Sequence, residues 1–150
     1  MVHIAGDIEI GRPVDEVFEV VADARNEPRY NPRMRRAEKL SPGPIAVGTR
    51  FRSELVAMGR PVEAITEITG YDPPRRLAST SRLPTMEVWG SLTFDLIPGG
   101  TRLRWSWDLR PRGALKLMGP ALGPVGRRRE REVWEGLKRL LEARPAGSAG

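Results

Sequence analysis

The sequence predicts an α+β domain in which a curved antiparallel sheet of seven strands wraps around a long C-terminal helix. Three observations predict this fold. Residues 2–10 alternate apolar and polar side chains, which is the period of a half-buried strand. Residues 34–110 continue as short apolar or alternating runs between turn residues, and the period becomes helical after residue 126. Strands joined by short turns pair as antiparallel neighbours, and only the last helix is long enough to cover their apolar face.

The first strand is followed by one or two short helices. Gly11-Arg12-Pro13 ends the strand, and Pro13 fits the first turn of a helix. Apolar residues then recur at helical spacing from Val14 to Val21, with acidic residues early in the helix, where its dipole favours them. Residues 23–32 contain Asn and Pro at several positions, so we expect a loop with one helical turn and Tyr30 packed beneath it.

The remaining strands are predicted at residues 34–40, 49–58, 62–71, 76–83, 87–97 and 101–110, separated by proline- and glycine-rich turns. The last of these is the clearest, because its apolar and polar residues alternate without interruption. One face carries Leu103, Trp105, Trp107 and Leu109, and the other carries Arg102, Arg104, Ser106, Asp108 and Arg110. Pro98-Gly99-Gly100 before it indicates a hairpin.

The C-terminal helix is expected to be broken near residues 120–124, because prolines remove backbone donors there. Whether this break controls access to the interior or only shapes the chain stays open. After Gly126 a stripe from Val133 to Leu141 faces the sheet, while a basic run, Arg127-Arg128-Arg129-Glu130-Arg131, is read as a solvated face in which Arg131 could pair with Glu135. Residues 1–144 form one domain, and residues 145–150 are expected to be a flexible tail.

The composition excludes several kinds of chemistry. The chain of 150 residues has no cysteine and one histidine, His3, so neither a Cys-based zinc site nor a multi-histidine metal site can form. A Ser-His-Asp triad would have to use His3, which we predict to be a surface residue. We expect no cofactor and no metal. No run of about 18 apolar residues and no secretory signal is seen, so we expect a cytoplasmic protein.

The formal net charge of +6 is compatible with an anionic partner, but the basic residues are scattered and acidic residues lie between them. Neither a nucleic-acid motif nor a glycine-rich phosphate loop is present. We therefore expect no nucleic acid as a partner. The state of assembly, monomer or homodimer, is left open.

Five short motifs, in this order and spacing, resemble the SRPBCC superfamily, also called START-like or helix-grip, and within it the polyketide cyclase/dehydrase and lipid-transport group. The resemblance covers roughly residues 2–143. Its motifs are Arg12-Pro13-Val14-Asp15-Glu16-Val17-Phe18 followed by Asp23, then Tyr30-Asn31-Pro32, Val47-Gly48-Thr49-Arg50-Phe51, Gly99-Gly100-Thr101-Arg102-Leu103 and Leu137-Lys138-Arg139-Leu140-Leu141-Glu142.

The resemblance implies a cavity between the sheet and the C-terminal helix that encloses a small apolar molecule such as a lipid, a fatty acid or a polyketide-like compound. Apolar walls with a few polar groups are typical of such sites. The residues expected to face the cavity are Tyr30, Phe51, Leu55, Leu92, Phe94, Leu103, Trp105, Trp107, Leu117, Met118 and Leu122. Ordinary core packing is the alternative interpretation for each of them.

Two other functions remain open at this point. The first is a polyketide cyclase or dehydrase that uses polar groups on the cavity wall, for which the candidates are Tyr30, Thr66, Thr80, Arg82 and Ser91. Against it, no two acidic residues are predicted to lie inside together, and no catalytic residue is assigned. The second is a protein-interaction module whose cavity has collapsed.

Overall fold

The structure is a computed structural model and describes residues 1–144. Seven strands and two α-helices follow one another in the predicted order, with one 3₁₀ helix after α1 and another after β7. The elements are β1 (Val2–Ile10), α1 (Val14–Ala22), η1 (Ala24–Arg29), β2 (Met34–Lys39), β3 (Arg50–Ala57), β4 (Arg60–Asp72), β5 (Arg76–Leu83), β6 (Met86–Ile97), β7 (Gly100–Pro111), η2 (Gly113–Ala121) and α2 (Leu122–Glu142).

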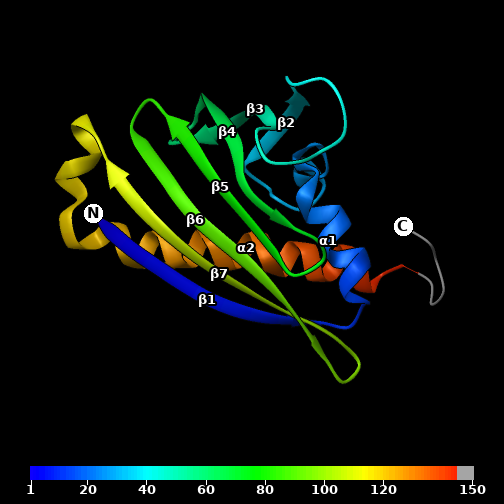
Figure 1. Cartoon of the computed structure of the whole chain (residues 1–150). Coiled ribbons are helices and arrows are strands. Elements are labelled where there is room, and N and C mark those ends of the chain that lie inside the picture. Colours follow the sequence, from blue (N-terminus) through cyan, green and yellow to red (C-terminus); the bar gives the residue numbers. More distant parts are fainter. Residues whose placement is uncertain (145–150) are drawn as a thin grey trace.

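All seven strands belong to one antiparallel sheet with the order β1-β7-β6-β5-β4-β3-β2. The strands after β1 are therefore a meander, and β1 is added at the edge beside β7, as the predicted short turns require. Figure 1 shows the sheet curving over α2, with α1 at one end and η2 at the other, beside the N-terminus. This confirms the predicted α+β helix-grip architecture.

The turns differ from the prediction in one detail. Met58 (φ 53°) and Gly59 (φ 76°) alone form the turn between β3 and β4. Two residues with positive φ make the tight hairpin whose twist matches that of the flanking strands. Arg60 and Pro61, which the sequence placed in the turn, already pair with Ala57 and Val56 in the ladder.

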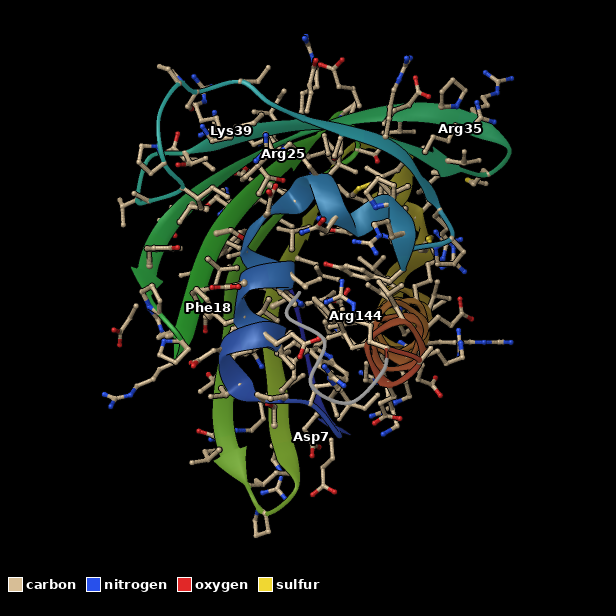
Figure 2. The ribbon with its side chains drawn as sticks, turned by 90° about the vertical axis from the view of Figure 1, so that its right-hand side faces the viewer. Asp7, Phe18, Arg25, Arg35, Lys39 and Arg144 are labelled. Atoms are coloured by element: carbon tan, nitrogen blue, oxygen red, sulfur yellow. The ribbon has the colours of Figure 1, made fainter. Side chains whose placement is uncertain are left out.

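The core lies at one end of the inner face of the sheet, beneath α1. Phe18 of α1 contacts Phe94 of β6 edge-on, with ring centroids 5.0 Å apart, and Leu103 of β7 is fully buried in the same cluster. Figure 2 shows Phe18 between its helix and the strands. The fully enclosed part of the interior is thus a packed core, stabilised by burial of apolar surface.

The other end of the inner face is only half-buried. The register of the ladders places a set of partly exposed residues there, and we call this set the open inner face. It consists of Leu55, Val62, Thr66, Ser79, Ser81, Leu83, Met86, Val88, Gly90 and Trp107. Trp107 lies in a cross-strand row that runs from Ile4 of β1 through Trp107 to Gly90 of β6 and Ser79 of β5. Small residues therefore lie on the β6 side of the ring.

The predicted break in the C-terminal helix is present at Gly119 and Pro120. Gly119 takes φ 51° and ψ −127°, a conformation that suits glycine, and it interrupts the 3₁₀ segment η2. Pro124 lies inside α2 without breaking it, because the first turn of a helix does not use that backbone N–H. The break therefore lies at the first of the two prolines only.

The C-terminal end of α2 is fixed to the start of the chain. Glu142 accepts a hydrogen bond from the backbone N–H of Gly11 at 2.8 Å, and Lys138 donates to the carbonyl of Glu9 at 2.7 Å. These contacts hold α2 along β1 and set the distance between the helix and the sheet. The tail predicted at residues 145–150 lies outside the described residues. Within residues 1–144, no helix combines the length and the apolar character that a membrane crossing requires.

Candidate functional site

A carboxyl group on α2 binds two tryptophan rings where the helix faces the open inner face. Glu130 Oε1 accepts a hydrogen bond from Trp107 Nε1 of β7 at 2.7 Å and a second from Trp134 Nε1 at 3.0 Å. Trp134 lies one helical turn beyond Glu130, so both are on the same face of α2. The pair of bonds fixes the edge of the Trp107 ring and joins the sheet to the helix at this point.

The environment of Glu130 raises the pKa of its carboxyl into the neutral range. Burial and, to a smaller degree, the charge of Glu27 raise the pKa of Glu130 to about 7, against the opposing effect of the two indole donors. Burial disfavours a charged carboxylate unless a cation or enough hydrogen bonds compensate for the lost water. Glu130 can therefore both donate and accept a proton near neutral pH.

Glu27 of η1 is the second partly buried carboxyl. Its Oε2 accepts a hydrogen bond from Asn31 Nδ2 at 2.8 Å, which lowers its pKa, but burial has the larger effect and raises it. Tyr30 lies next to both acids. Burial, followed by the charges of Glu27 and Glu130, raises the pKa of its hydroxyl well above the ordinary value.

We call Glu27, Tyr30 and Glu130 the acid–tyrosine corner. Within residues 1–144, Glu27 Oε1, Glu130 Oε2 and the Tyr30 hydroxyl have no hydrogen-bond partner, and none of them is among the buried unpaired atoms. Those buried unpaired atoms are Arg33 Nη1 and Trp105 Nε1. The corner therefore presents three polar oxygen atoms that water or another molecule can reach.

Aromatic rings surround this corner. The Trp134 ring lies 6.1 Å from the Tyr30 ring and 6.2 Å from the Trp105 ring, both tilted by about 30°. The guanidinium of Arg131 lies 5.5 Å from the centre of the Trp105 ring, a distance that favours a cation–π contact. Arg131 thus packs on an aromatic face, and the predicted pairing with Glu135 is wrong.

The structure separates the predicted cavity residues into three groups. Tyr30, Phe51, Leu92, Phe94, Leu103, Trp105 and Leu122 are buried, while Leu55, Trp107 and Met118 are half-buried. Leu117 is 88 % exposed, so the expectation that it faces the interior is wrong. The physical reason is the 3₁₀ conformation of residues 113–121, which turns this side chain outward instead of continuing the helical stripe.

The polar candidates divide between the two faces of the sheet. Thr66 lies on the inner face, and its hydroxyl is 2.7 Å from that of Ser81. Thr80 and Arg82 alternate with Ser81 and belong to the outer face, where the side chain of Arg82 is 76 % exposed. Ser91 lines a shallow hollow of about 570 Å³ on the outer face, together with Asp7 and Arg104. Only Tyr30 and Thr66 therefore remain as inner-face candidates.

His3 is exposed on the outer face, as the sequence predicts. Its Nδ1 lies 3.0 Å from Asp108 Oδ1, and its Nε2 lies 3.5 Å from Ser106 Oγ. The three residues lie on paired strands whose backbone N–H groups are used in the ladder, so the group lacks the pre-arranged backbone donors of an oxyanion hole. We interpret it as a cross-strand ion pair with a weak third contact.

The sequence reasoning missed the acidic pair. We expected no two acids inside together, yet the charge of Glu27 raises the pKa of Glu130, and both charges raise the pKa of Tyr30. Glu130 had been assigned to the solvated basic run, although it lies four residues before Trp134 and seven before Leu137, on the apolar stripe of the helix. That spacing could have predicted that Glu130 faces the interior. Glu27 lies in an irregular turn, where no regular spacing indicates which side chains are buried.

A second hollow, of about 590 Å³, lies beside the break in the C-terminal helix. It is lined by the N-terminus, the end of β7 and η2, and it includes Arg110, Arg112, Lys116 and Leu122. It opens at the surface and is separate from the acid–tyrosine corner. No group of three or more His, Asp or Glu side chains that could hold a metal ion occurs in residues 1–144.

Comparison with known families agrees with this geometry. A family described as polyketide cyclase/dehydrase and lipid transport matches residues 1–142. The chain belongs to this family. Uncharacterized proteins of Mycobacterium tuberculosis and Mycobacterium bovis are 28% identical to it over 118 residues, which is 76% of this chain. The chain spans about 65% of the length of these relatives.

Solved structures support the fold of the polyketide cyclase/dehydrase and lipid-transport family. An aromatase/cyclase from Streptomyces sp. R1128 superposes with a TM-score of 0.77 at 20% identity, covering 98% of both chains. A Thermus thermophilus protein gives 0.80 at 18%, covering 95% of this chain and 99% of its own. A START superfamily protein from Mycobacterium smegmatis gives 0.71 at 16%, with 93% and 94% covered. These likenesses establish the architecture and leave the ligand to be found.

Proposed function

We propose that this protein binds a small, largely apolar ligand on the open inner face, with a flat part of the ligand against Trp107. One observation carries the proposal. Trp107 is held by its bond to Glu130, and on its β6 side the inner-face neighbours are Gly90 and Ser79, which leave that side of the ring without a large side chain. A fixed aromatic ring next to small residues offers a contact surface whose ordering costs little entropy.

The family supports this type of ligand. Its description combines polyketide cyclases and dehydrases with lipid transport, and all of these handle molecules with large apolar parts. The open inner face has the matching chemistry, since its aliphatic members, such as Leu55, Val62 and Val88, alternate with the hydroxyl groups of Thr66 and Ser81. Few polar groups within an apolar surface are typical of small-molecule sites.

The test is a titration with N-phenyl-1-naphthylamine, an uncharged probe whose fluorescence rises in an apolar environment. We expect saturable binding to the unmodified protein. Trp107→Ala should weaken it about tenfold, because truncation of a central aromatic contact costs roughly 1.4 kcal/mol. Trp89→Phe is the matched control: this tryptophan lies on the outer face beneath Arg110 and should leave the affinity unchanged. Equal affinities for Trp107→Ala and the unmodified protein, both folded by circular dichroism, would contradict the proposal.

A cyclase- or dehydrase-type enzyme is the second candidate, and Glu130 favours it. A carboxyl whose pKa is about 7 can remove and return protons at neutral pH, which general acid–base catalysis requires. The two functions differ in one observable. An enzyme would convert an aromatic poly-β-ketone analogue to a dehydrated product, seen by its absorbance, and Glu130→Gln would stop this while the probe still bound. A carrier would release the analogue unchanged.

A further inference from the structure

The acid–tyrosine corner has an excess of acidic groups for an interior site. Elsewhere in the molecule, an arginine or a lysine lowers the pKa of Asp23, Glu132 and Glu142. No arginine or lysine lowers the pKa of Glu27 or Glu130. Within residues 1–144, neither carboxyl takes part in any of the observed ion pairs, which lie at the surface or around Glu16. Both carboxyl groups thus lack a cationic partner among the described residues.

The Tyr30 hydroxyl gives a second, independent indication that something binds here. Tyr30 is only 5 % exposed, yet its hydroxyl makes no hydrogen bond within the described residues. The backbone N–H of Tyr30 donates to the carbonyl of Glu27 at 3.0 Å, and its ring lies 6.1 Å from that of Trp134, which donates to Glu130, but its hydroxyl bonds to neither carboxyl. Tyrosine hydroxyls in the interior usually have a partner, so this atom and the two carboxyl oxygens are available to a ligand that reaches them.

We propose that the ligand carries a protonated amine, which binds at the acid–tyrosine corner while its apolar part lies against Trp107. This inference rests on the proposed function and specifies its ligand class. An ammonium group supplies the missing positive charge and donates to the three unpaired oxygen atoms, Glu27 Oε1, Glu130 Oε2 and the Tyr30 hydroxyl. The faces of the nearby aromatic rings also attract a cation.

The same arrangement disfavours a ligand with a carboxylate. A fatty acid anion placed in the corner would face two acidic groups, and like charges in a site of low dielectric repel each other strongly. The rest of the molecule has the opposite preference, because the net charge of +6 repels cations from the surface in general. Preferential binding of an amine would therefore point to this corner and not to the surface.

Three ligands of one shape test the inference: 2-naphthylmethylamine, 2-naphthylmethanol and 2-naphthoic acid, each displacing N-phenyl-1-naphthylamine at pH 8. We expect the amine to bind at least about tenfold more tightly than the alcohol, and the carboxylate to bind most weakly. Glu130→Gln and Glu27→Gln should each weaken the amine about tenfold and leave the alcohol within about twofold. Glu135→Gln removes an exposed charge from the same helix and is the matched control.

The outcomes separate this inference from the proposed function. If the probe and the alcohol bind but the amine binds no better, or if its advantage survives both Gln substitutions, the amine inference is wrong and the proposed function stands. If Glu135→Gln weakens the amine as much as Glu130→Gln does, the effect is one of general charge and the inference is also wrong. If no probe binds to the folded protein, both fail. Should Glu130→Gln not fold, Glu27→Gln decides, because it retains both indole bonds to Glu130.

Discussion

Raising the pH from about 4.5 to 7.5 should lower the free energy of unfolding by about 2–3 kcal/mol through Glu130 alone, at 1.4 kcal/mol per pKa unit. The folded-state pKa of about 7 lies above the ordinary value of 4.5. Between these two values the folded protein holds a proton that the unfolded chain has lost. Stability from this group is therefore complete below pH 4.5 and is lost as the pH rises through 7, with no further change above it.

Glu130→Gln isolates this contribution. The amide keeps an oxygen that can accept the bonds from Trp107 and Trp134, but it cannot ionise. Urea unfolding at pH 5, 6, 7 and 8 should show that the variant gains stability relative to the unmodified protein as the pH increases. Burial also raises the pKa of Glu27. Because Glu27 and the surface acids are present in both proteins, their effects cancel when the free energy of unfolding of the unmodified protein is subtracted from that of the variant. A constant difference across the four pH values would show that Glu130 ionises normally and is not desolvated.

The strands could be predicted to within one or two residues because apolar and polar side chains alternate along a half-buried strand. β7 is the example: the alternation from Leu103 to Leu109 gave its limits, its inner face and its place beside a hairpin. The break in the helix could be found because proline and glycine act through local backbone geometry. Local rules of this kind need no knowledge of the neighbouring chain segments.

The candidate site could be predicted only in part, because it depends on contacts between distant segments. Trp107 was expected on the inner face, but the sequence could not show that its indole N–H would meet a carboxyl 23 residues away. Glu130 lies among four arginines, so local charge suggested a solvated position. Its burial results from the packing of α2 against the sheet, which places it beside Trp107 of β7. The prediction for Leu117 was wrong for a local reason, because we assumed the period of an α-helix across a segment that forms a 3₁₀ helix.

Gly136→Ala is expected to destabilise the protein by about 3 kcal/mol or more, which is at the upper end of overpacking effects. A Cβ at this position would lie 2.2 Å from the backbone carbonyl oxygen of Tyr30. Backbone on both sides cannot yield as a flexible side chain would, so α2 and the end of η1 must separate. In an exposed helix the same change would gain about 1 kcal/mol from helix propensity, so the sign of the effect depends on this contact alone.

Gly136→Ala should also change the acid–tyrosine corner, because the displaced backbone moves Tyr30 away from Glu27 and Glu130. Thermal and urea unfolding of Gly136→Ala should therefore show the loss of stability, and the surviving folded fraction should bind N-phenyl-1-naphthylamine more weakly. Arg139→Ala, an exposed change on the same helix, should alter stability by less than about 0.5 kcal/mol. A stabilised Gly136→Ala would mean that helix propensity outweighs the contact, and α2 would then lie farther from Tyr30 than the site described above requires.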